Sequence, residues 1–153
     1  MAGHIQIVMD QAALNTFLAA EFPQVAPDLY VDSVSDSELV LRLRVKEMHL
    51  RPGGTVSGPT MFGLADVAIY LTILSRIGPV ALAVTTNASI DFMRKPEAGR
   101  DLLASCRLLK LGKQLAVGDA LIRSEGRPDP VARCSMTYAI PPHRESRSGA
   151  IPG

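Results

Sequence analysis

The chain has 153 residues, of which 47% are hydrophobic and 20% are charged, and its formal net charge is +1. This length suits one domain with a core of its own. The near-neutral charge, the absence of Trp and an aromatic content of 5% argue against a nucleic-acid-binding surface. We therefore expect one globular domain over residues 1–142, followed by a polar tail, 143–153, that we expect to be disordered.

The compartment is predicted from features that the sequence lacks. Cys106 and Cys134 have no CxxC spacing and lie in predicted strands, so we expect two small buried thiols in a reducing compartment. No secretory signal pattern begins the chain, which predicts a cytoplasmic location. The apolar run 61–74 is shorter than the roughly 20 residues that a membrane span requires, and it contains Asp66. We expect no association with a membrane.

The first part of the chain predicts one helix and two strands. Asp10 can cap a helix that runs to about Glu21, where apolar residues recur at helical spacing. Residues 29–34 look like a short strand that is followed by an Asp-Ser turn. In residues 38–46, apolar and basic side chains alternate, which predicts a strand buried on one face only.

A second helix is predicted from about residue 59 to residue 77. Pro59 suits a first helical position, and Asp66 is the single charged residue between Arg51 and Arg76. Apolar residues cover nearly every face, which predicts a helix buried all round. A carboxylate inside such a helix costs several kcal/mol unless other groups compensate it. Asp66 is therefore the first candidate for a functional residue.

Four extended segments follow, separated by Gly- and Pro-containing turns, and they cover residues 80–95, 102–111, 114–124 and 133–140. The short connections indicate antiparallel neighbours rather than parallel strands joined by helices. One apolar helix against about six strands predicts an α+β fold in which an antiparallel sheet curls around the helix.

Two motifs carry a resemblance to a known family. Ser57-Gly58-Pro59-Thr-Met-Phe-Gly-Leu-Ala-Asp66 and the segment from Asn87 to Gly99 resemble the hotdog-fold acyl-CoA thioesterases of the phenylacetate (PaaI) type. The similarity covers about residues 48–138. It implies a hotdog fold and hydrolysis of an acyl-CoA thioester to free acid and CoA. It also implies a homodimer or a dimer of dimers with active sites across the dimer interface, without a metal or a cofactor beyond the CoA of the substrate.

The resemblance also implies roles for individual residues. Asp66 falls on the catalytic carboxylate, and Gly58 falls on the glycine whose N–H polarises the thioester carbonyl. Thioester hydrolysis needs a base or a nucleophile together with donors for the developing oxyanion, and the sequence leaves both roles open for Asp66. Thr85 matches a Ser or Thr that orients the attacking water and comes from the partner subunit.

The chain departs from the family pattern in the loop before the helix. Ser57 replaces a His, and Arg51 replaces a common Asn. Ser57 could bind the acyl carbonyl or cap the helix, and Pro59 has no N–H to serve as a second main-chain donor. These replacements keep a second hypothesis open, namely a non-catalytic protein of the same fold that binds acyl-CoA.

The resemblance places the CoA arm along the end of the long strand at residues 80–95. Arg94 and Lys95 lie there, and Arg100 and Lys113 could extend the same basic rim. Arg51 could contact a phosphate or an acyl carboxylate. The three His residues show no spacing typical of a metal site or a catalytic triad.

Overall fold

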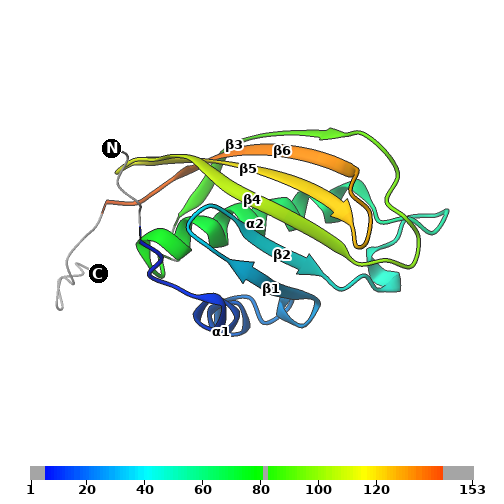
Figure 1. Cartoon of the computed structure of the whole chain (residues 1–153), viewed down its shortest axis with the longest axis horizontal. Helices are drawn as coiled ribbons and strands as arrows, with labels where there is room; N and C mark the ends of the chain where they lie inside the picture. Colours follow the sequence, from blue (N-terminus) through cyan, green and yellow to red (C-terminus); the bar gives the residue numbers. More distant parts are fainter. Residues whose placement is uncertain (1–5, 81–82, 143–153) are drawn as a thin grey trace, which may run out of the picture.

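The computed structural model describes residues 6–80 and 83–142 (Figure 1). The predicted tail at 143–153 lies outside the described residues. Two helices and six strands follow the chain in the order α1 (Gln11–Glu21), β1 (Leu29–Val34), β2 (Leu39–Leu43), α2 (Gly58–Ile77), β3 (Val84–Phe92), β4 (Leu102–Leu111), β5 (Leu115–Ser124) and β6 (Pro130–Ala139). Short 3₁₀ turns at Ala26–Asp28 and Glu47–His49 complete the set.

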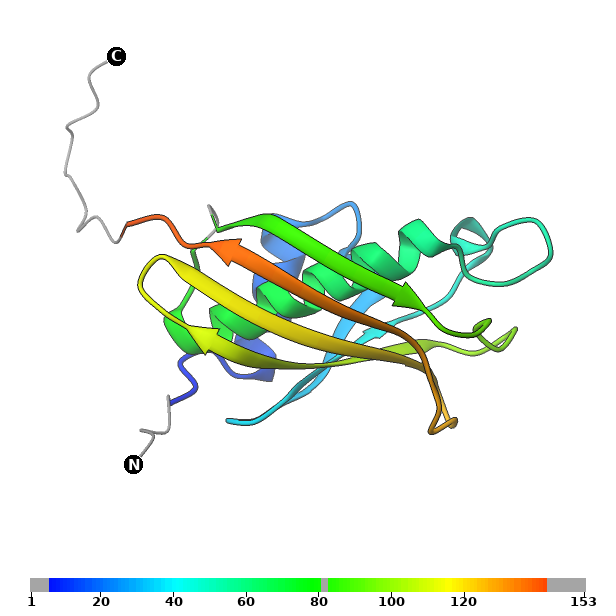
Figure 2. The ribbon, with the colours of Figure 1, turned by 90° about the horizontal axis from the view of Figure 1, so that it is seen from above.

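The six strands form one sheet in the order β1-β2-β4-β5-β6-β3, and every neighbouring pair is antiparallel. The sheet curls over α2, which runs along its concave side (Figure 2). The apolar sides of the strands and most of α2 make one continuous core. The predicted α+β architecture, with a curled antiparallel sheet around one apolar helix, is confirmed.

The predicted strands are close to the observed ones and differ mainly at their ends. β2 ends at Leu43 because the N–H of Arg44 donates to the carbonyl of Asp28 and the N–H of Val45 donates to the carboxylate of Asp101, 3.1 Å away. β3 covers 84–92 rather than 80–95, and β6 begins at 130 rather than 133. At α1 the predicted cap is present, since Asp10 accepts a hydrogen bond from the N–H of Ala13 at 2.9 Å.

Helix α2 is longer than its apolar run suggested, so the length of the helix does not exclude a membrane span. It has 20 residues, and 67% of its most apolar window is buried inside the protein. Burial, rather than length, therefore identifies α2 as the core helix of a folded domain. Cys106 and Cys134, on strands that pack over this helix, are both free and buried, as predicted.

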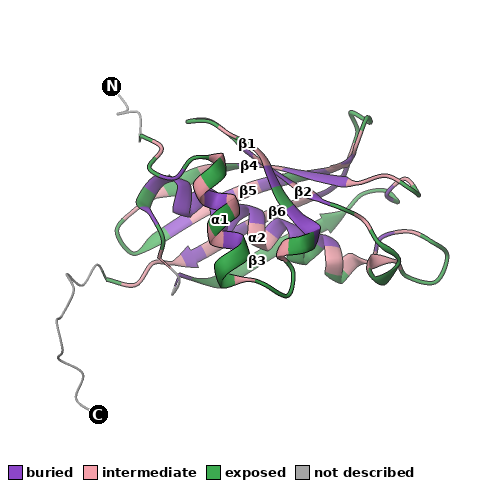
Figure 3. Ribbon diagram, turned by 90° about the horizontal axis from the view of Figure 1, so that it is seen from below, coloured by how far each residue is buried: buried purple, intermediate pink, exposed green. Residues whose placement is uncertain are grey.

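The prediction that α2 is buried all round is wrong for its first half. Pro59, Phe62 and Gly63 are exposed and Asp66 is half-buried, whereas nearly all of the second half is buried (Figure 3). Hydrophobicity alone does not distinguish a side chain that packs under the sheet from one left on an open face. The helix therefore has an open stripe, and Asp66 lies on it.

One glycine fixes how closely the helix packs under the sheet. A Cβ atom at Gly118 of β5 would lie 2.5 Å from Cγ2 of Ile69 on α2. Real Cβ atoms do not approach other heavy atoms so closely, so only glycine permits this helix-to-sheet distance.

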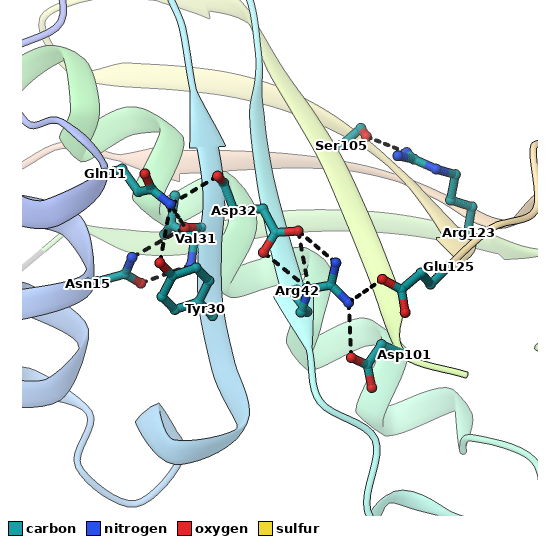
Figure 4. Close-up of polar contacts among 10 residues, drawn as sticks. All are labelled: Gln11, Asn15, Tyr30, Val31, Asp32, Arg42, Asp101, Ser105, Arg123 and Glu125. Carbon is teal, nitrogen blue, oxygen red and sulfur yellow. Dashed lines mark hydrogen bonds and ion pairs between the residues drawn. The ribbon is translucent and has the colours of Figure 1, made fainter. Parts of the chain in front are cut away.

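The β1 edge of the sheet is covered by α1 (Figure 4). The side-chain amide of Asn15 accepts from the N–H of Val31 at 2.9 Å and donates to its carbonyl at 3.2 Å, as a neighbouring strand would. Gln11, one helical turn earlier, donates to the carbonyls of Val31 and Asp32. The edge strand therefore has partners from within the chain.

Candidate active site

Asp66 lies on the open stripe of α2 with one carboxylate oxygen held by two hydroxyl groups. The hydroxyl of Thr85 on β3 donates to Oδ1 at 2.7 Å. The hydroxyl of Tyr138 on β6 donates to the same Oδ1 and also lies 2.8 Å from the main-chain oxygen of Asp66. Both contacts are made within one chain. Thr85 therefore holds the carboxylate of its own chain, whereas the resemblance implied that it reaches the site from the partner subunit.

The sheet register explains why these two hydroxyls meet. Thr85 and Tyr138 are directly opposite each other in the antiparallel β3–β6 pair, immediately before a bulge. On β6, Cys134, Met136 and Tyr138 alternate toward the core. The ring of Tyr138 is stacked on Tyr70 of α2, with centroids 6.0 Å apart.

Tyr138 is a site residue that sequence reasoning did not identify. Burial, together with its hydrogen bond to Asp66, raises the pKa of Tyr138 far above its usual range. The phenol therefore stays protonated and can act only as a neutral donor to the carboxylate. The alternation along residues 133–140 places Tyr138 on one face with Cys134 and Met136, but no local signal connected it to a residue 72 positions earlier.

The second oxygen of Asp66 is open. No donor among the described residues reaches Oδ2, in contrast to the two donors on Oδ1. Burial, followed by the charge of Asp66, raises the pKa of the nearby Cys134 thiol to about 11, so this thiol is neutral at physiological pH. Within the described residues, no group of three or more His, Cys, Asp or Glu side chains could hold a metal ion.

The start of α2 supplies a free main-chain donor. No acceptor for the N–H of Gly58 is found among the described residues, as is usual for the first N–H groups of a helix. The helix dipole places partial positive charge at this N–H. A Cβ added to Gly58 would lie 3.4 Å from Cζ of Phe92, so the ring of Phe92 forms an apolar wall beside this glycine.

Ser57 caps α2 in this structure. Its Oγ accepts from the N–H of Thr60 at 3.3 Å and lies 2.8 Å from the Thr60 hydroxyl. The N–H of Ser57 donates to the carbonyl of His49 at 3.0 Å, which fixes the loop before the helix. Pro59 occupies the first helical turn and has no N–H, so Gly58 is the main-chain donor that these two residues leave unpaired at this end among the described residues.

Gly58 and Asp66 of one chain are too far apart to act on the same carbonyl group. They are eight positions apart on one helix, which corresponds to about 12 Å along the axis. An oxyanion donor lies about 3 Å from the carbonyl oxygen, and a base reaches the reacting atoms through at most one water. The two predicted groups of one chain therefore do not meet at one reacting carbonyl.

The predicted basic residues do not form one rim within a chain. Arg94, Lys95 and Arg100 follow the end of β3, where Arg94 lies 3.5 Å from Asp129. Lys113 lies on the β4–β5 turn at the other end of the sheet, because the strand residues next to this turn pair with the end of β6 and thus with the start of β3. The sequence did not give the strand order that decides this separation.

Arg100 and Arg51 differ in their surroundings. Arg100 lies 3.3 Å from Glu97 and donates to the carbonyl of Glu125 at 3.0 Å, so it is engaged within the fold. Arg51 is exposed on the loop before α2, where Gly53 and Gly54 have positive φ angles of 107° and 84°. No ion pair involving Arg51 is found in the described part of the chain.

Comparison with known proteins decides the family. The pattern of the thioesterase superfamily matches residues 53–131, which include both Gly58 and Asp66. The chain belongs to the thioesterase superfamily. A solved structure of a "putative thioesterase" from Silicibacter sp. TM1040 is 57% identical, with a TM-score of 0.85, over 91% of this chain and 96% of that one. The hotdog fold expected for this superfamily member is thereby confirmed.

Other relatives within the superfamily are more distant. A "putative esterase" of Pseudomonas aeruginosa is 34% identical over 105 residues, which cover 68% of this chain and 76% of that protein. The PaaI protein of Escherichia coli, from the phenylacetic acid degradation operon, is 26% identical, with a TM-score of 0.71, over 85% of this chain and 93% of that one.

Proposed function

We propose that this protein hydrolyses acyl-CoA thioesters to a free acid and CoA, as a member of the superfamily related to the PaaI type. The observation that carries the proposal is the carboxylate of Asp66, with Oδ1 held by two hydroxyls and Oδ2 open on an exposed helix stripe. An open, oriented carboxylate can act as a general base or as a nucleophile. The cytoplasmic location is part of the proposal, since two buried free thiols fit a reducing compartment.

In the general-base route, Asp66 accepts a proton from a water that attacks the thioester carbonyl carbon. The carbonyl oxygen gains negative charge, which the N–H of Gly58 stabilises. The tetrahedral intermediate then expels the CoA thiolate, which takes the proton back from Asp66. In the nucleophilic route, the carboxylate attacks the thioester carbonyl and expels the CoA thiolate, and water then hydrolyses the resulting anhydride to the free acid and the restored Asp66 carboxylate, with the released proton passing to the thiolate. Both routes use the same residues and give the same products.

The site is completed by a second copy of the chain. Gly58 lies beside Phe92, at the end of β3, whereas Asp66 contacts Thr85, at its start. If the β3 strands of two copies pair antiparallel, the Gly58 end of one chain faces the Asp66 end of the other. This pairing closes the separation of about 12 Å within one chain. The proposal therefore includes a homodimer, which can pair further into a dimer of dimers.

CoA recognition is assigned to the exposed basic residues near the end of β3. Arg94 and Lys95 are both exposed there, and Arg100 is close to them in sequence. In the antiparallel dimer, Lys113 of the partner subunit comes to the same end as these residues, so Lys113 can join the rim across the interface. Arg51, on its exposed loop, is available for a phosphate.

One observation favours the alternative of an acyl-CoA-binding protein without activity. The hydroxyl of Ser57 is engaged in capping α2 and does not replace the polar role of the family His. Tight binding of acyl-CoAs without release of free thiol would support this alternative over hydrolysis.

The decisive experiment is a free-thiol assay over a panel of short-chain, long-chain and aromatic acyl-CoAs. Wild type and D66N are compared at equal oligomeric state. We expect thiol release by wild type and loss of turnover in D66N. Equal turnover by both proteins would exclude the role of Asp66.

A second assay tests the shared site. G58P removes the N–H, and the backbone of the preceding Ser57, with φ −73° and ψ 154°, already suits a residue before proline. G58A keeps the N–H and is the matched control. If G58P and D66N are each inactive, their co-expression should restore roughly a quarter of wild-type activity, because half of randomly assembled dimers carry one intact site out of two. No restoration would place both groups in one chain.

A further inference from the structure

We propose that Tyr138 is a positioning residue of this site: its hydroxyl fixes Oδ1 of Asp66, so that Oδ2 faces the reacting atoms. The inference rests on the proposed function, since it names the group that orients the proposed base. It goes beyond that function because the superfamily pattern ends at residue 131 and does not include Tyr138.

The carboxylate is asymmetric. Oδ1 accepts from the hydroxyls of Thr85 and Tyr138, and in the described residues no donor reaches Oδ2. A carboxylate held through one oxygen cannot rotate freely about its side-chain bond, so the other oxygen keeps a constant direction. Such orientation before the reaction lowers the entropic cost of the chemical step.

The donor itself is held in place by aromatic packing. The ring of Tyr138 is stacked on Tyr70 at an interplanar angle of 24°. Tyr70 in turn contacts Phe22, which follows α1, and Phe17 of α1, with centroid distances of 5.8 Å and 6.2 Å. Tyr138 is only 3% exposed, so its hydroxyl has little freedom to leave the carboxylate.

Among the described residues, no charged side chain makes a hydrogen bond or an ion pair with Asp66. Facing it from β6 are Tyr138 and the neutral thiol of Cys134, and from β3 the uncharged Thr85. On α2 itself, Tyr70 is one turn away, and burial raises its pKa, so it is neutral as well. Within the described residues, two neutral hydroxyls are therefore what orients this carboxylate.

The test compares two matched variants, Y138F and Y70F. Each loses one buried hydroxyl and keeps its ring; the hydroxyl of Tyr70 donates to the carbonyl of Val80 at 3.3 Å and not to Asp66. We expect Y138F to lower kcat about 10- to 100-fold with little change in KM. We also expect the acidic limb of its pH–rate profile to move up by about 0.5–1 pH unit, because loss of a donor raises the pKa of a carboxyl group. Y70F should keep the wild-type limb.

A second readout does not depend on activity. In ¹³C-labelled protein, the carboxyl resonance of Asp66, assigned by its absence from D66N, reports the titration directly. Its midpoint should rise in Y138F and stay unchanged in Y70F. If Y138F does not fold, biosynthetic replacement of the three tyrosines by 3-fluorotyrosine keeps every hydroxyl but makes it more acidic, and the midpoint should then fall.

The outcomes separate the two proposals. Lower kcat with an unchanged Asp66 midpoint would overturn the positioning role and leave only a structural one. A wild-type protein without thioesterase activity, but with a midpoint that rises in Y138F, would overturn the proposed function and support the contact. A midpoint that is equal in wild type and Y138F overturns the inference whatever the activity.

Discussion

The two edges of the sheet are treated in opposite ways. The β1 edge is covered by α1, and the side chains of Asn15 and Gln11 take the place of a neighbouring strand (Figure 4). The β3 edge has no such cover in the described residues, and every position of β3 except Ile90 is exposed. An uncovered edge strand invites pairing with another chain. One edge is therefore closed from within, whereas the other is left uncovered, as the proposed pairing with a second copy requires.

Polar side chains add to the difference. Near the covered edge, Arg42 of β2 contacts three carboxylates, those of Asp32, Asp101 and Glu125, at 2.7–3.1 Å. These hydrogen bonds, first of all the one with Asp32, raise the pKa of the Arg42 guanidinium above its usual value. Near the bare edge there is the exposed pair Arg133–Asp91. The side chains near the covered edge are therefore linked by the ion-pair network around Arg42, whereas Arg133 and Asp91 near the bare edge form one exposed pair.

The largest effect is expected from a charge on the bare edge. S89K places a lysine at an exposed position of β3, so two like charges approach each other when β3 strands pair. We expect dissociation to the 16.4 kDa monomer in sedimentation experiments. Hydrolysis should fall by about 100-fold, because the Gly58 N–H and the Asp66 carboxylate then no longer meet at one substrate. The control is S135K, directly opposite on β6. A dimeric, active S89K would show that the copies associate elsewhere.

The next effect concerns stability on the covered side. R42M leaves three carboxylates close together without their cation, and we expect unfolding free energy to fall by about 2–3 kcal/mol in urea titrations. R133M on the bare side should cost less than about 1 kcal/mol, because its ion pair is exposed. Equal losses for both variants would contradict the difference between the two sides.

A smaller loss is expected at the cover itself. N15L keeps the approximate shape of the side chain but leaves the N–H of Val31 without its partner, whereas the Val31 carbonyl keeps the hydrogen bond from Gln11. We expect a loss of about 1–2 kcal/mol in unfolding free energy, with unchanged oligomeric state and kcat. A change in oligomeric state would mean that the two edges are not independent.

The smallest effect tests whether the core excludes water equally well on the two sides of the sheet, through one buried cysteine on each side. Burial raises the pKa of Cys106, on β4, to about 12 and that of Cys134, on β6, to about 11. Above about pH 9 the unfolded thiols lose protons that the folded ones keep, so stability falls as pH rises. Between pH 9 and pH 10 we expect each thiol to contribute a loss of about 1 kcal/mol in unfolding free energy. C106A and C134A should each flatten this dependence to the same extent.

Much of the fold was predictable from the sequence because it depends on local patterns. The bounds of β1 and β4 were predicted to the residue from extended segments and the turn residues beside them. The open stripe of α2 was not predictable, because the exposed Phe62 has the same hydrophobicity as a core residue. A side chain that a second copy would cover looks, in one sequence, like a side chain under the sheet.

The site was predictable only in part, for a similar reason. Asp66 stood out as a lone charge in an apolar helix, and the resemblance added Gly58 and Thr85. Tyr138 meets Asp66 through the β3–β6 register, which no spacing along the chain reveals. The position of Lys113 likewise depends on which strands are neighbours, and this was known only once the sheet order was known.

The glycine at position 118 has a consequence for comparing relatives of this protein. Because a single methyl group there would approach Ile69 to 2.5 Å, a chain with alanine at this position must hold its core helix farther from β5. The carboxylate on that helix would then stand at a different height relative to the hydroxyls of the sheet. Two homologues with identical site residues can therefore differ in activity through one methyl group on β5, which is not a site residue itself.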